Sequence, residues 1–190
     1  MKKTIFTIFF AGLSALSFSQ GENTSLKKDI VAVDIGLPLP GIWINYERHL
    51  AGLFTLKSEF GLGFGFGLLS FVPVDYPNNY YAFTPIVKVE PRYYYNFDRR
   101  DSLGKKTSYN ASNYLALAAT YISNLFTISN VPGLGVERTV SLIPQWGIKR
   151  TVGKRMNFEF SFGYGVAHSF DSDRTEGNLG LDLRFGYYLK

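Results

Sequence analysis

The sequence contains no cysteine and only two histidines in 190 residues. The absence of cysteine excludes disulfides, thiolate metal sites and a lipid anchor attached through a cysteine. Beyond residue 20 there is also no long apolar run, which excludes a membrane-spanning helix in that part of the chain. The fold must therefore depend on backbone pairing and side-chain packing.

Charge is modest. The formal net charge is +5, and two of these charges belong to Lys2 and Lys3, which leaves +3 for the rest of the chain. The basic residues are spread along the sequence without a dense basic run, so nucleic acid is not an expected partner.

The N-terminus has the three parts of a secretory signal. A basic start, Met1-Lys2-Lys3, precedes the apolar run Thr4–Leu16, and Ser17-Phe18-Ser19 offers small residues for a signal peptidase. The alternative is a membrane anchor, but the run is shorter than the roughly 20 residues that a spanning helix needs. We therefore expect residues 1–19 to be a signal peptide, cleaved before Gln20, and residues 20–190 to form one domain.

Large apolar residues alternate with small or charged ones in three long segments, Phe54–Leu68, Arg155–Ala167 and Leu179–Lys190. Alternate side chains of a strand point to opposite faces, so each segment has one bulky face and one small face. Turn signals divide the chain into eight expected strands: 29–37, 42–49, 53–68, 84–98, 113–125, 135–150, 154–169 and 178–190.

Two closed sheets fit eight such strands, a soluble barrel of the lipocalin type and a transmembrane barrel. The interior of an eight-stranded barrel is just wide enough to be filled by side chains. The bulky faces of all eight strands would overfill it, whereas the small faces fit inside. The bulky face also carries no charge near mid-strand, because Arg48 and Arg138 lie near strand ends. We predict an all-β fold, an eight-stranded antiparallel up-and-down transmembrane β-barrel.

Two further features concern the outward face. Pro91 and Pro144 fall inside expected strands, and we expect a bulge or a distorted hydrogen bond at each because proline lacks the backbone donor. Aromatic residues near strand ends suggest girdles at the membrane–water boundary. They are Tyr46, Tyr93, Tyr95, Phe97, Trp146 and Tyr187.

The inward face carries six acids and five bases. Since a buried charge is tolerable only when it is paired, these residues predict a salt-bridged network that fills the lumen. A structural role is one interpretation, and a path for protons or ions is the alternative. The residues are Asp34, Glu47, Lys57, Glu59, Lys88, Glu90, Arg92, Lys149, Glu159, Asp182 and Arg184.

Glycines dominate the inward face at the opposite end of the lumen from the termini. Large aromatic side chains from Trp43 and the loop 69–83 are expected to fill this half. The alternative is an outward-facing pocket for a small apolar or lipid-like molecule. The residues expected to line such a pocket are Trp43, Gly61, Gly63, Gly65, Gly163 and Gly165.

Catalytic chemistry has few candidates. His168 and Ser169 are adjacent, so a strand would turn their side chains to opposite faces, which disfavours a hydrolytic triad. Asp171-Ser172-Asp173 is a weak cation-binding signal in a short loop. We expect no catalytic residues, no metal site and no cofactor, and we keep a lipid-modifying enzyme only as a third alternative.

With its expected signal peptide, alternating strands and polar core, the chain resembles the small eight-stranded outer-membrane barrel proteins. Glu90-Pro91-Arg92-Tyr93-Tyr94-Tyr95-Asn96, followed by a basic linker, resembles an element of uncharacterised Bacteroidota barrel proteins. The resemblance implies the outer membrane of a Gram-negative bacterium, with outer-membrane lipid and the barrel assembly machinery as partners. The resemblance specifies no activity, and our first hypothesis is a non-enzymatic barrel with a structural or surface-interaction role. The alternative is porin-like binding or passage of a small apolar ligand.

Overall fold

The computed structural model describes residues 26–37, 40–66 and 81–190. The expected signal peptide, residues 1–19, and most of the loop 69–83 lie outside these residues. The elements in chain order are β1 (Asp29–Leu37), β2 (Gly41–Ala51), β3 (Phe54–Phe66), β4 (Tyr81–Tyr93), α2 (Phe97–Ser102), η2 (Ser108–Asn110), β5 (Asn113–Ile122), β6 (Ile128–Ser129), β7 (Thr139–Val152), β8 (Met156–Ser169) and β9 (Arg174–Tyr188). No helix among the described residues is long and apolar enough to span a bilayer.

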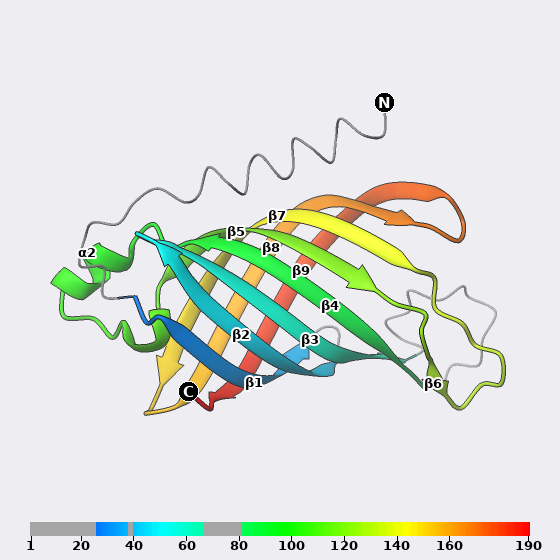
Figure 1. Ribbon diagram of the computed structural model, residues 1–190, viewed down its shortest axis with the longest axis horizontal. Helices are drawn as coiled ribbons and strands as arrows, with labels where there is room; N and C mark the ends of the chain where they lie inside the picture. Colours follow the sequence, from blue (N-terminus) through cyan, green and yellow to red (C-terminus); the bar gives the residue numbers. More distant parts are fainter. Residues whose placement is uncertain (1–25, 38–39, 67–80) are drawn as a thin grey trace.

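Eight long strands close into a barrel (Figure 1). The order of the long strands is β3-β2-β1-β9-β8-β7-β5-β4, and β3 also pairs with β4, so each of these eight strands is paired on both sides. Each of these pairings is antiparallel. The two-residue strand β6 only extends the pairing of β4. The predicted fold class, a closed eight-stranded antiparallel barrel, is confirmed.

The two ends of the barrel differ. Lys27 and Lys28 lead into β1, and β9 finishes at the same end, beside α2 and η2 (Figure 1); we call this the basal end. The β8–β9 hairpin and β6 lie at the other end, which we call the apical end.

Large apolar side chains point outward over the barrel. Tyr164 is 67% exposed, Leu179 70% and Ile42 65%, and exposed apolar side chains occur on every long strand, so together they form an apolar surface larger than soluble monomers usually expose. Inward positions of the same strands are buried or half-buried, and many of them are polar or charged. The outward face is therefore the bulkier and more apolar of the two.

Neither proline produces a bulge. The β4–β5 ladder passes from the pair Val89–Ala119 to the pair Arg92–Ala116 in unchanged register, across Pro91. The β7–β8 ladder likewise keeps its register across Pro144. Because proline lacks only its own N–H, a short interruption of one ladder accommodates it. Of the two expected alternatives, the bulge is therefore absent, and the ladder is interrupted locally.

The fourth strand ends earlier than predicted. β4 stops at Tyr93, and Phe97 begins α2 instead of continuing the strand to residue 98. The side chain of Phe97 is 1% exposed and packs in a cluster with Leu26, Tyr94 and Tyr114. Burying this ring at the basal end of the barrel draws the backbone out of the sheet, so the expectation that Phe97 belongs to an outward girdle is wrong.

Candidate functional site: the lumen of the barrel

Strand register places opposite charges next to each other inside the barrel. Lys57 on β3 lies opposite Glu90 on β4, and Glu59 lies opposite Lys88. The same rule holds elsewhere in the lumen, where Glu159 on β8 faces Arg184 on β9. Opposite charges at facing positions stabilise a pair of strands, so this register and the lumen charges support each other.

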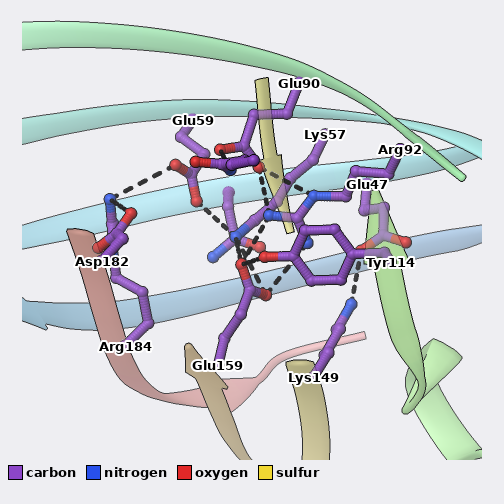
Figure 2. A network of polar contacts seen from close by, with 12 residues as sticks. Glu47, Lys57, Glu59, Glu90, Arg92, Tyr114, Lys149, Glu159, Asp182 and Arg184 are labelled. Carbon is purple, nitrogen blue, oxygen red and sulfur yellow. Dashed lines mark hydrogen bonds and ion pairs between the residues drawn. The ribbon is translucent and has the colours of Figure 1, made fainter. Parts of the chain in front are cut away.

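Glu159 is the centre of the network (Figure 2). Its carboxylate accepts hydrogen bonds from Arg92 at 2.6 and 3.1 Å, from Lys57 at 3.2 Å and from the Tyr114 hydroxyl at 3.0 Å. The Arg92 guanidinium also lies 4.2 Å from the centre of the Tyr114 ring. Arg92 bonds Glu90 as well, so one buried cation joins two carboxylates.

A second group of ion pairs continues the network toward the apical end. Lys88 lies 2.5 Å from Glu90 and 2.9 Å from Asp182, and it approaches Glu59 at 3.8 Å. Arg184 donates two hydrogen bonds to Asp182, at 2.6 and 2.9 Å. The Asp182 side chain keeps 22% exposure, the highest among the lumen carboxylates that form ion pairs.

A separate pair lies at the basal end. Lys149 Nζ is 2.5 Å from Glu47, whose other oxygen accepts hydrogen bonds from the Tyr94 hydroxyl at 2.9 Å and the Asn110 amide at 3.0 Å. Asn110 also accepts a hydrogen bond from the backbone N–H of Lys27 at 2.7 Å. The loop after α2 is thereby tied to the lumen and to the segment that precedes β1.

Asp34 makes no ion pair among the described residues. The Asn45 amide donates to it at 2.6 Å and the Asn157 amide at 2.9 Å. The other five acids and the five bases all take part in ion pairs, so the paired set is neutral. The structure thus brings together all the charged residues singled out from the sequence, with Asp34 held by amides.

The lumen residues missed by reasoning from the sequence include Tyr94, Tyr114 and Asn110. A signal for Tyr114 was present. Gly147 lies directly opposite it, and a side chain at Gly147 would collide with the Tyr114 ring. A glycine on the inward face therefore marks the space that an inward ring on the neighbouring strand occupies. Asn110 is the last residue of the short helix η2, where strand alternation gives no information.

A cavity of about 300 Å³ occupies the apical half of the lumen. Its apolar wall includes Ile86, Ala118 and Ile143, and Thr120, Ser141 and Asn178 contribute polar groups. Lys88, Asp182 and Arg184 from the ion-pair network also line it. The cavity therefore has an apolar wall and, where it meets the ion-pair network, charged groups.

Of the residues expected to line a pocket, only Trp43 forms part of this cavity wall. The Trp43 ring covers Gly61, and the Ile86 side chain covers Gly63. Backbone oxygens of β7 lie close to Gly163 and Gly165, and the side-chain surroundings of Gly65 are outside the described part. The glycines thus make room for neighbouring groups, and the cavity opens beside β5 and β7 instead.

Catalytic and metal-binding groups are sparse. His168 Nδ1 lies 2.8 Å from the Thr175 hydroxyl, and the Ser169 hydroxyl contacts Thr139 at 3.2 Å. In the described residues no group of three or more histidine, aspartate or glutamate side chains is arranged to hold a metal ion.

Comparison of the chain with protein-family models found no match, and comparison with curated proteins found none either. Among solved structures, the chain is similar to the backbone structure of the Yersinia pestis outer membrane protein Ail in a phospholipid bilayer nanodisc. The TM-score is 0.41 and the sequence identity 14%, over 85% of this chain and 99% of that chain.

Proposed function

We propose that this protein is a non-enzymatic integral β-barrel of the Gram-negative outer membrane, with a structural or surface-interaction role. One observation carries the proposal: large apolar side chains face outward from a closed barrel whose interior holds the charges. Lipid offers no hydrogen bonds to a free sheet edge, and a closed barrel has none. Exposing the same apolar outward face to water would be energetically unfavourable.

The lumen supports a barrel that does not conduct. Side chains of the ion-pair network cross its middle, and Tyr94, Phe97 and Tyr114 pack at the basal end. An ion that passed would have to displace buried carboxylates and cations from one another, which costs several kcal/mol for each pair.

Membrane extraction and conductance test this proposal together. The protein is expressed with residues 1–190 in a Gram-negative host, and the envelope is washed with alkaline carbonate and urea. We expect the protein to stay in the outer-membrane fraction and to show no steady conductance in planar bilayers. Release into the wash as a monomer contradicts membrane integration, and large stable conductance contradicts the closed lumen.

The apical cavity favours a second function, the binding of a small amphiphile. A ligand with an apolar body would contact Ile86, Ala118 and Ile143, while a polar end would reach Lys88 and Asp182. Mass spectrometry of the protein purified from membranes would detect such a molecule. An Ala118→Phe variant, which fills the cavity, should lose it, whereas the outward-facing variant Leu117→Phe should retain it.

A further inference from the structure

The positive charges that lie scattered in the sequence gather at the basal end of the fold. Among the described residues, eleven lysines and arginines surround this end, against the three acidic side chains of Asp29, Asp98 and Asp101, which is an excess of eight positive side chains. The apical end, in contrast, has two arginines and four acids among its described residues. The basal cations are Lys27, Lys28, Arg48, Arg99, Arg100, Lys105, Lys106, Arg150, Lys154, Arg155 and Lys190. We call them the basal cation ring.

None of the eleven makes an ion pair within the part of the chain that the structure describes. All the other described lysines and arginines do: five pair in the lumen, and at the apical end Arg138 pairs with Asp171 and Arg174 with Glu176. The unpaired cations are therefore confined to one end of the barrel.

The cations of this ring also lie near one another. Lys106 Nζ donates a hydrogen bond to the Gly153 carbonyl, which brings the loop after α2 beside the β7–β8 turn. Burial and the neighbouring charges of Arg155 and Lys190 lower the pKa of Lys27 below its ordinary value. Because the ring holds more cations than the three nearby acids can neutralise, an external anion would stabilise it.

Outward-facing aromatic residues identify the kind of anion. Tyr46 lies two positions before Arg48 on the same face of β2, and the Trp146 indole donates to the Tyr95 hydroxyl at 2.8 Å on the outer surface of the same end. Tyrosine and tryptophan favour the headgroup level of a bilayer. Along the chain Arg48 follows Tyr46, and Arg99 and Arg100 follow Tyr95, so these cations come after the rings, where lipid phosphates would lie.

We infer that the basal cation ring binds the headgroups of anionic phospholipids in the leaflet that surrounds this end of the barrel. The inference rests on the proposed membrane function. Basic residues near a membrane surface attract anionic lipid, and the attraction is screened by salt. The ring would select the lipids around the barrel and set the depth of its basal end.

Four ring members allow a clean test: Arg48, Arg99, Lys154 and Arg155. Their side chains are exposed and make no hydrogen bond or ion pair within the described residues, so replacing them should leave the fold intact. One variant carries Arg48→Gln, Arg99→Gln, Lys154→Gln and Arg155→Gln. The matched control carries Arg48→Lys, Arg99→Lys, Lys154→Arg and Arg155→Lys, which keeps every charge.

Each protein is reconstituted in phosphatidylcholine vesicles, and its association with spin-labelled phosphatidylglycerol and phosphatidylcholine is compared. We expect the wild type and the control to prefer phosphatidylglycerol, by about fivefold for each cation that a headgroup contacts. The glutamine variant should lose most of this preference, and 1 M salt should reduce it in the wild type.

Several results would overturn the inference. A wild type without lipid preference would do so, as would an unchanged preference in the glutamine variant. So would a preference for lipopolysaccharide over phosphatidylglycerol that the glutamine variant loses, because the ring would then bind a different class of anionic lipid. If the protein inserts into vesicles but shows no lipid preference, only the inference about the basal cation ring is contradicted. If the protein inserts into no vesicle, the proposed membrane function is contradicted as well.

Discussion

Removing the charge at the centre of the lumen should destabilise the barrel strongly. Glu159 accepts hydrogen bonds from Arg92, Lys57 and Tyr114, and its side chain is 6% exposed. Breaking a buried ion pair costs about 3–5 kcal/mol. Lys57 keeps Glu59 at 2.5 Å and Arg92 keeps Glu90, so Glu159→Gln should lower the free energy of unfolding by about 3 kcal/mol, the lower end of this range.

Urea unfolding of the protein folded in phospholipid vesicles measures this change through tryptophan fluorescence, since Trp43 is 3% exposed inside the barrel. Arg138→Gln is the control, because it breaks an exposed ion pair and should leave the unfolding midpoint unchanged. The double variant Arg92→Met with Glu159→Leu should recover much of the loss, since it leaves no single charge unpaired. A Glu159→Gln variant as stable as the wild type would refute the reasoning.

Three further predictions test other parts of the structure. Gly147→Val should lower the free energy of unfolding by about 1–3 kcal/mol, because the new side chain collides with the Tyr114 ring. Adding Tyr114→Ala to the same chain should relieve this strain, and the same urea titration measures both effects. Asn110 has a φ of 62° and bonds Glu47, so Asn110→Gly and Asn110→Ala should both destabilise, with alanine worse by about 1 kcal/mol; equal losses would contradict the backbone argument. The hydrogen bonds from Arg138 hold the pKa of Asp171 below its ordinary value. The contact between the two side chains should therefore persist at mildly acidic pH and be lost only as the pH falls through that lowered pKa. An NMR titration that gives the Asp171 carboxyl an ordinary or raised pKa would contradict this prediction.

The closed barrel could be predicted because its cause is local. Alternation along each strand, as in Phe158 to Phe162, places bulk on one face, and the limited interior volume decides which face points out. Boundaries failed where a tertiary contact overrode the pattern. Phe97 continues the alternation of β4, yet the basal cluster of Leu26, Tyr94 and Tyr114 draws it into α2.

Partners within the lumen depend on strand register, which alternation leaves open. The pattern indicates that Lys57 points inward, but its two carboxylate contacts, Glu59 and Glu159, come from strands β3 and β8. The basal cation ring shows the same limit on a larger scale. Its members run from Lys27 to Lys190 and form no basic run in the sequence, and only the closure of the barrel brings them to one end.

Spin-label accessibility at single introduced cysteines tests most directly whether the outward face contacts hydrocarbon. The chain has no cysteine of its own, so each label reports one site. Leu117→Cys lies on the outward face at mid-strand, and Lys154→Cys lies in the β7–β8 turn. In vesicles, the label at 117 should be relaxed by oxygen and shielded from a water-soluble nickel chelate, with the reverse at 154. Equal access of the nickel chelate to both labels would contradict the account.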